Sequence, residues 1–562
     1  MVFRTRMVLP ILVLAGLLSA SAAAAPRSAT QPTHRPGKSA PHAAGSQPDK
    51  VAAAHAHYAA GVVQALSGDP ELALEEFRQA AQLDPTDEEL TMDVSRRFVE
   101  RRHLEQALEL LKRSAARPEA GGQVFSRLGF IYAQLGRLDE AIAANRQAIK
   151  RSPADFAGHQ FLYDNLLQRG QRAEACQVLE QAAQVSAADA GFLVNLAGMF
   201  VNHYRQFPAE KTSANQAALA ALNRAAELKP SDVSLRLRLA DGFSSTGDAV
   251  QAARIYESLL PETGDDTLVR ANIRGRLVDL YLRRSDPARA ITQLEAITRE
   301  DPANVAASYQ LGGLAEEEQN HALAAESLRR VVVLRPDFEQ AYYELAQAQV
   351  GLNQPAATLA TLAEARQKFR PNFVGEFLSG IASGELKKFD DALAHLNAAE
   401  AIARASEPQR LNGGFYYQLG SVYERKGDFA QAEKYLRHSL ELAPDLAMAQ
   451  NYLGYMWADR GTNLDEARQL IEQAVKAEPK SFAYLDSLGW VLFKLHQPEA
   501  ALPQILKAIE LSPAPDATLY EHLGDVYLAL HQPGKARAAW KKSLQVESNA
   551  AVRRKLDSTP AR

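Results

Sequence analysis

The chain has 562 residues, of which 46% are hydrophobic and 23% charged, so its composition is that of a folded protein and not of a disordered one. Its 63 Lys and Arg residues and 67 Asp and Glu residues give a formal net charge of -4, which leaves no basic surplus for nucleic acid as a principal ligand. The single cysteine, Cys176, excludes a disulfide framework within the chain, a cysteine-based zinc site and a CxxC redox motif.

Residues 1–25 have the pattern of a secretory signal peptide. Arg4 and Arg6 precede an apolar stretch at residues 7–18, and small residues follow up to residue 25. This stretch has about a dozen residues, whereas a membrane span needs roughly 20. We therefore interpret residues 1–25 as an export signal. An uncleaved membrane anchor is the alternative that the sequence leaves open.

Residues 26–50 change in composition and are rich in Pro, Ala and Ser. Such a segment buries too little apolar surface to offset the entropy lost on ordering, so we predict a disordered linker.

The rest of the chain repeats itself at a nearly constant period, which is roughly 34 residues. Each repeat has the helical periodicity of two antiparallel helices of about 13 residues, and a Pro-containing segment often ends it. Neither helix can bury its apolar stripe alone, so neighbouring repeats must stack into an all-α solenoid. We predict about 14 stacked helix-turn-helix units over residues 51–550 and a C-terminal tail at residues 551–562. The predicted repeats start near residues 54, 88, 122, 156, 190, 233, 271, 305, 339, 373, 413, 447, 482 and 517.

Two positions of the repeat, the eighth and the twentieth, are occupied by small residues in most repeats. The twentieth position is Ala in nearly every repeat, and small side chains at the two places would let the paired helices cross at close backbone contact. A glycine inside a helix costs roughly 1 kcal/mol relative to alanine, so its recurrence implies a gain in packing. The eighth position is glycine at Gly61, Gly129, Gly312, Gly380, Gly420, Gly454, Gly489 and Gly524. Tyr163 and Val278 replace it in two repeats and leave the helix crossing there open.

The pattern resembles the tetratricopeptide repeat (TPR) family. The resemblance implies a right-handed superhelix whose inner groove is lined by the first helix of each repeat and binds peptides or proteins. Residues 451–461 and 485–492 also resemble exported bacterial adaptors of this family that serve proteases or assembly machines of the cell envelope. The residues that carry the family pattern in the third repeat are Phe125, Leu128, Gly129, Tyr132, Ala141, Ala148 and Pro153.

Positions 5 and 9 of the later repeats lie on one face of the first helix, away from the packing positions. Rigid aromatic side chains beside hydrogen-bonding groups suit a bound peptide or an amphipathic helix. The alternative is that these side chains extend the core between neighbouring first helices. The predicted protein-binding groove consists of Tyr343, Phe377, Tyr417, Asn451, Tyr455, Asp486, Trp490, Glu521 and Asp525.

The fifth repeat contains an insertion at about residues 202–215. Loops on a rigid scaffold often carry function, but a lengthened surface turn is the simpler interpretation, and the sequence does not assign a role to this segment.

No phosphate-binding loop, nucleophile elbow or HExxH helix occurs in the sequence, and we predict no catalytic, cofactor-binding or metal-binding residues. Cys176 is interpreted as a buried, unreactive thiol. The sequence therefore favours an exported, non-enzymatic scaffold in the bacterial periplasm or outside the cell, which binds protein partners and neither nucleic acid nor, as a mature chain, the membrane interior. The alternative is an accessory subunit that activates or positions an envelope hydrolase or a polymer-export machine. A third hypothesis, an enzyme in its own right, requires a catalytic site that these patterns do not reveal.

Overall fold

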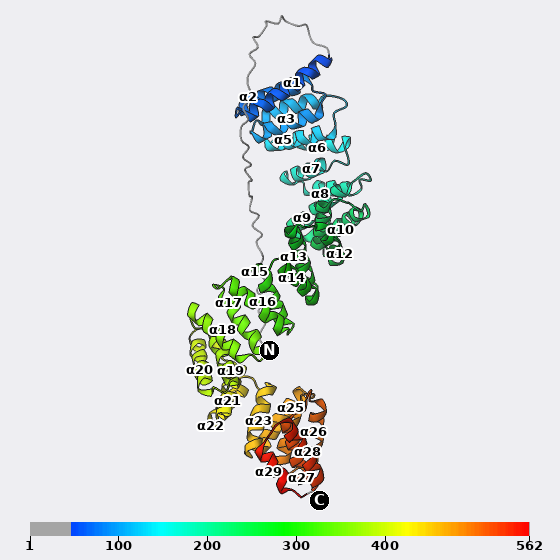
Figure 1. The fold of residues 1–562 in the computed structure, drawn as a ribbon. Coiled ribbons are helices and arrows are strands. Elements are labelled where there is room, and N and C mark those ends of the chain that lie inside the picture. The colour runs from blue at the N-terminus through cyan, green and yellow to red at the C-terminus, as the bar shows by residue number, and fades with distance from the viewer. Residues whose placement is uncertain (1–46, 561–562) are drawn as a thin grey trace. The chain divides into compact units, whose positions relative to one another are not determined.

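The structure is a computed structural model that describes residues 47–560, and within this range it contains helices and no strand. The predicted signal peptide at residues 1–25 and most of the predicted linker lie outside the described residues. The chain divides into an N-terminal unit that ends at Val185 and a C-terminal unit that begins at Ser186. Each unit is built from antiparallel helix pairs, as Figure 1 shows, so the predicted all-α repeat fold is confirmed.

The helices of the N-terminal unit are α1 (Gln47–Leu66), α2 (Pro70–Leu83), α3 (Glu88–Glu100), α4 (Leu104–Ala115), α5 (Gly122–Gln134), α6 (Leu138–Arg151), α7 (Phe156–Gln168) and α8 (Arg172–Ala183). Odd numbers are the first helices of repeats and even numbers are the second helices.

The C-terminal unit continues the same alternation and adds three short 3-10 helices. Its first six α-helices are α9 (Ala190–Gln206), α10 (Lys211–Glu227), α11 (Val233–Thr246), α12 (Ala249–Leu259), α13 (Thr267–Arg283) and α14 (Pro287–Glu300). Seven more are α15 (Val305–Glu317), α16 (His321–Leu334), α17 (Glu339–Gly351), α18 (Pro355–Lys368), α19 (Phe373–Glu385), α20 (Phe389–Ser406) and α21 (Gly413–Lys426). The last eight are α22 (Phe429–Leu442), α23 (Ala447–Arg460), α24 (Leu464–Ala477), α25 (Phe482–Lys494), α26 (Pro498–Leu511), α27 (Ala517–Ala529), α28 (Pro533–Val546) and α29 (Ala550–Ser558). The 3-10 helices are η1 (Pro208–Glu210), η2 (Leu260–Thr263) and η3 (Pro408–Arg410).

All predicted repeat starts coincide with the first residue of a first helix except in the first and seventh repeats. Capping side chains fix many of these starts. The carboxylate of Asp87 accepts a hydrogen bond from the Leu90 amide at 2.9 Å, and the side chain of Asn372 accepts one from the Gly375 amide at 2.9 Å. Such caps satisfy amide groups that have no partner inside the helix.

The turn between the two helices of a repeat shares one feature in every repeat except the inserted fifth, although the twelfth repeat adds a second left-handed residue, Asn463 (48°). The fifteenth residue of the repeat has a positive φ, as at Gly68 (84°) and Gly427 (90°). Glycine adopts this left-handed conformation without steric cost, whereas Gln319 (60°) and His496 (59°) adopt it as residues with a Cβ. The turn is therefore imposed by the packing of the pair and not by glycine alone.

The eighth-position glycines lie where the two helices of a repeat cross. A Cβ built on Gly312 would lie 2.6 Å from Leu328 Cγ, and one built on Gly420 would lie 2.8 Å from Leu436 Cγ. These distances are below van der Waals contact, so a larger side chain would force the helices apart. The paired alanines at position 20 are buried, as at Ala324 and Ala432. The predicted close crossing is confirmed. Where Tyr163 or Val278 replaces the glycine, the two helices of the repeat still pair.

Both ends of the array extend beyond the predicted boundaries. Helix α1 begins at Gln47, inside the predicted linker, because Pro48 is tolerated in a first helical turn and Ala-rich sequence follows. Helix α29 covers most of the predicted tail at residues 551–562 and continues the repeat pattern there. Asn549 caps it through the Val552 amide at 3.3 Å, and Leu556 is buried against the last repeat.

Candidate protein-interaction faces

The predicted groove residues all lie on first helices of the C-terminal unit, from α17 to α27. We call the surface formed by successive first helices the first-helix face. Tyr343, Asp486 and Trp490 are buried, with 8%, 6% and 7% of their surface exposed. The remaining members are half-buried: Phe377, Tyr417, Asn451, Tyr455, Glu521 and Asp525.

The two earliest residues of the set pack between neighbouring repeats. The Tyr343 hydroxyl donates to Glu339 at 3.2 Å, and burial raises the pKa of Tyr343 to about 12. The ring of Phe377 stacks on Phe373 with centroids 5.5 Å apart and lies 6.0 Å from the ring of Phe415 on the next first helix. These contacts are those of core side chains.

Tyrosines on α21 and α23 form the middle of the set. Tyr417 meets the ring of Tyr452 edge-on at 5.6 Å, and the Tyr452 hydroxyl donates to Glu424 at 2.8 Å. Tyr455 lies one turn after Asn451 on α23, and its pKa is raised by burial and by nearby carboxylates such as Asp459. These rings are held rigidly yet keep part of their surface exposed.

A histidine that the sequence analysis left unassigned joins α25 to α27. Both carboxylate oxygens of Asp486 lie 2.9 Å from Nδ1 of His522, and both residues are buried. The ring of Trp490 stacks on His522 with centroids 4.0 Å apart and planes 14° from parallel. Asp486 and Trp490 therefore hold neighbouring repeats together.

The last two acidic residues of the set are neutralised from within the chain. Lys555 on α29 donates to Glu521 at 2.8 Å and to Asp525 at 2.6 Å. Asp525 also accepts from Trp540 Nε1 at 3.0 Å, and burial raises the pKa of its carboxyl group. The basic partner that these carboxylates would suit is thus already present in the structure.

The first-helix face of the N-terminal unit has a cationic part that the repeat pattern does not predict. Asp93 on α3 accepts from the Tyr58 hydroxyl at 2.9 Å and from Arg97 Nε at 2.8 Å, while Arg96 lies 3.7 Å away. Arg127 on α5 forms no ion pair with any residue in the described range. Its pKa is lowered by burial and by the like charge of Arg96. Arg127 is at position 6 of its repeat and Arg96 is at position 9 of the preceding one. Comparing the charges at these two positions in successive repeats would have revealed the two arginines.

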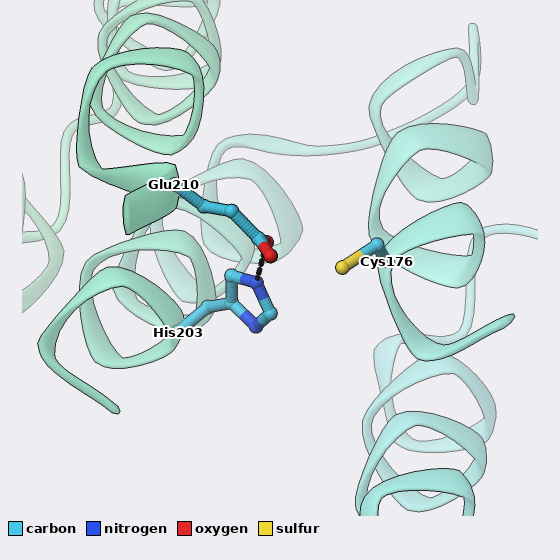
Figure 2. Close-up of side chains that lie close together, drawn as sticks. All are labelled: Cys176, His203 and Glu210. Atoms are coloured by element: carbon cyan, nitrogen blue, oxygen red, sulfur yellow. Dashed lines mark hydrogen bonds and ion pairs between the residues drawn. The ribbon is translucent and has the colours of Figure 1, made fainter. Parts of the chain in front are cut away.

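The inserted segment of the fifth repeat extends helices and does not form a long surface turn. It lengthens α9 and α10, and the two are joined through the short η1. His203 Nε2 is hydrogen-bonded to Glu210 Oε2 at 2.6 Å across this corner (Figure 2). The hydroxyl of Tyr204 donates to the Ser245 carbonyl at 3.2 Å, and Asn215 donates to the Thr246 carbonyl at 3.0 Å. The insertion therefore braces the end of α11 in the next repeat.

Cys176 lies on the second helix α8 and is half-buried. Burial raises the pKa of its thiol, although Arg172 acts in the opposite direction. A thiol with a raised pKa is protonated at neutral pH and is a poor nucleophile.

Sequence profiles described as tetratricopeptide repeat match residues 54–87, 95–156, 276–337 and 414–446. The ends of these segments fall at or near helix-pair boundaries of the structure in most cases. The chain contains tetratricopeptide repeats. Arrays of such repeats are generally protein-interaction scaffolds, so binding of proteins is the function that the fold supports.

Relatives match parts of the chain, among them two bacterial proteins and one human protein. TPR repeat-containing protein PA4667 of Pseudomonas aeruginosa is 34% identical over 227 residues, which are 39% of this chain and 36% of the relative. Type IV pilus assembly protein PilF of the same organism is 28% identical over 137 residues, 24% of this chain and 53% of the relative. Human protein O-mannosyl-transferase TMTC3 is 23% identical over 398 residues, 68% of this chain and 38% of the relative. The matched regions span about a third to a half of these relatives.

Among solved structures, the APC/C hetero-tetramer Cut9-Hcn1 is similar with a TM-score of 0.40 at 14% sequence identity, over 85% of this chain and 96% of the matched chain. Within residues 47–560, no helix combines the length and the apolar character that crossing a bilayer requires.

Proposed function

We propose that the chain is an exported, non-catalytic scaffold that holds protein partners of the bacterial cell envelope on its first-helix faces. The observation that carries this proposal is the unbroken alternation of first and second helices within each unit, which presents half-buried aromatic and polar side chains from one repeat to the next. Tyr417 and Tyr455 are examples, since they are fixed by neighbours yet partly exposed. Rigid, partly exposed aromatic residues dominate the energetics of many protein interfaces.

Two observations support a location in the periplasm or outside the cell. Residues 1–25 have the charge, the apolar core and the small residues of an export signal. One relative is named as a type IV pilus assembly protein, and pili are assembled in the cell envelope. Fusion of residues 1–50 to alkaline phosphatase, which is active only after export, tests this location. Activity equal to that of a fusion lacking residues 1–25 would contradict it.

Photocrosslinking tests the binding face. A photoreactive amino acid replaces Asn451 on the first helix α23 in one variant and the exposed Lys476 on the second helix α24 in a matched control. We expect light-dependent adducts with envelope proteins from position 451 that position 476 does not give. Identical adducts at both positions, or none at either, would count against a scaffold that binds through this face.

Substitution of Tyr417 separates binding from stability. Tyr417→Ala should weaken partner binding by roughly tenfold, while the helical circular dichroism is retained, because the ring is half-buried. Trp490→Ala should lower the melting temperature as well, because this ring stacks on His522 inside the repeat interface. If Tyr417→Ala unfolds the array to the same degree, Tyr417 is a core residue and not a binding residue.

A second candidate is an accessory subunit that positions an assembly machine or an envelope hydrolase. The relative named as a pilus assembly protein favours it. The two functions differ in one measurement, because an accessory subunit must change the turnover or assembly rate of the crosslinked partner, whereas a passive scaffold leaves that rate unchanged.

A further inference from the structure

Side-chain contacts join α1 to α3 and α5 to α7 on the first-helix face of the N-terminal unit. The Tyr58 hydroxyl on α1 donates a hydrogen bond to Asp93 on α3. The same carboxylate forms ion pairs with Arg97 and, at a longer distance, with Arg96. The helices α1, α3 and α5 lie side by side in Figure 1. A separate contact joins α5 to α7, because the rings of Phe130 and Phe161 have centroids 5.5 Å apart.

Positive charge on this face exceeds the negative charge in contact with it. Asp93 is engaged by Arg97 at 2.8 Å, which leaves Arg96 with a long 3.7 Å approach and an exposed side chain. Arg127 is half-buried, and no carboxylate within the described part of the chain pairs with it. Two arginines thus repel each other on a partly desolvated surface, and an added carboxylate would relieve this repulsion.

Apolar surface adjoins the arginine pair. The guanidinium carbon of Arg127 lies 6.0 Å from the centroid of Phe130, and both Phe130 and Phe161 are half-buried. The cationic section ends at α7, where Asp164 is exposed at the repeat position that Arg96 occupies in α3. The surface therefore combines two cations with two aromatic rings over three first helices.

We propose that this section of the first-helix face, formed by Arg96, Arg127, Phe130 and Phe161, binds an acidic, aromatic-containing peptide segment of a partner protein. A carboxylate of the segment lies between the two guanidinium groups, and a neighbouring apolar side chain packs on the phenylalanine rings. This inference rests on the proposed scaffold function and adds the chemical class of one partner. The preferred carboxylate is that of an Asp or Glu side chain, and a chain terminus is an outcome that the test distinguishes.

The seventh repeat provides an internal comparison. Arg276 occupies the sixth position there, as Arg127 does in the third repeat, and it is ion-paired with Asp241 from the preceding first helix. The Tyr256 hydroxyl also donates to Asp241. An arginine at this position is thus neutralised by an acidic residue at position 9 of the preceding repeat, where the N-terminal unit instead has Arg96. The partner would supply the missing carboxylate.

The length of the segment follows from helix spacing. Packed helices lie about 8–10 Å apart, so three first helices span about 20 Å, which an extended chain covers with about six or seven residues. The probe is a labelled decapeptide in which Glu alternates with Phe and both ends are blocked. One matched peptide has Gln in place of Glu, and a second has Gln and a free carboxyl terminus.

Fluorescence anisotropy with the full chain tests the proposal. We expect the Glu peptide to bind at least about tenfold more tightly than the blocked Gln peptide, with an affinity that falls as salt is added. Arg127→Gln should remove this preference, and Arg127→Lys should retain part of it. Arg276→Gln is the matched control and should leave binding unchanged, while the melting temperature of Arg127→Gln stays at or above that of the parent.

Each other outcome overturns the proposal. Equal or absent binding of the Glu and Gln peptides means that the arginine pair does not select acidic segments. Preference for the free carboxyl terminus means that the source of the carboxylate is wrong. An equal loss in Arg276→Gln means that binding occurs elsewhere. The scaffold function is judged separately, because crosslinking from position 451 lies in the C-terminal unit and does not depend on Arg127.

Discussion

On the first-helix face of the C-terminal unit, Glu521 and Asp525 share Lys555, whereas in the N-terminal unit Arg127 is close enough to Arg96 for the like charge to lower its pKa, and it has no carboxylate partner in the described range. Both sets occupy comparable positions of their repeats. Helix α29 has the place of a further first helix and supplies the cation that pairs with Glu521 and Asp525. No helix supplies a carboxylate to Arg127 in the described range. A charge that is paired inside the chain has no need of an external partner, and removing its partner leaves it uncompensated, while a charge without a partner is available to a ligand.

Removal of α29 should have the largest effect on this comparison. A chain that ends at Asn549 loses the burial of Val552 and Leu556, each worth about 1.5–3 kcal/mol, and uncovers Trp540. We expect the last repeat to lose about 3–6 kcal/mol of local stability. Hydrogen–deuterium exchange should accelerate in α27 and α28 and remain unchanged in α3 and α5. Unchanged exchange in α27 would show that α29 does not stabilise the last repeat.

The third repeat also differs from its neighbours at one buried position. Asn145 on α6 is fully buried against Gly129, and neither its amide nitrogen nor its carbonyl oxygen has a hydrogen-bond partner in the described structure. Other repeats place an aliphatic residue here, as Leu328 does beside Gly312. A buried polar group without partners costs about 1–3 kcal/mol.

Asn145→Leu should therefore stabilise the third repeat by about 1–3 kcal/mol. Slower hydrogen exchange in α5 and α6 is the measurement that checks this. The matched control is Leu179→Asn, which introduces the same unpaired amide at the same position of the fourth repeat and should destabilise it. If Asn145→Leu speeds exchange, the amide makes a contact that its surroundings require.

The repeat starts could be predicted from sequence because the close crossing needs small residues at fixed positions, and Gly420 and Ala432 show that requirement directly. The repeat period favours a lengthened turn at residues 202–215, because the period alone does not reveal that extra residues can lengthen both helices. Whether a predicted groove residue is buried or exposed depends on the side chains of neighbouring repeats. Trp490 is buried because His522, which belongs to the following repeat, stacks on it. Such a contact crosses a repeat boundary and has no signature within one repeat.

Arg127 was missed for the same reason. A single repeat shows only an arginine on a helix, and its meaning comes from the residue that the preceding repeat places beside it. Asp241 makes Arg276 structural, whereas Arg96 leaves Arg127 unpaired. Pairwise comparison of positions in successive repeats would have separated the two cases, but the burial that gives the contact its strength requires the packed structure.

The smallest expected effect compares the two charged sets directly. Lys555→Ala leaves Asp525 and Glu521 without a cation and should destabilise the last repeat by about 1–2 kcal/mol, since the pair is partly screened by solvent. Arg127→Ala removes a repelled charge and should change stability by less than about 0.5 kcal/mol. Hydrogen exchange, measured repeat by repeat at increasing denaturant concentration, gives the change in stability of both variants.

The loss of stability caused by Lys555→Ala should depend on pH. Burial raises the pKa of Asp525 above its ordinary 3.8, so the cost of keeping it charged is present at neutral pH and is lost as the pH falls through the raised pKa. Lys555 offsets that cost only while Asp525 is ionised. The difference in stability between the parent and Lys555→Ala should therefore be largest near neutral pH and shrink on acidification. A difference that is constant between pH 7 and pH 3 would show that the aliphatic stem of Lys555, and not its charge, stabilises the end of the array.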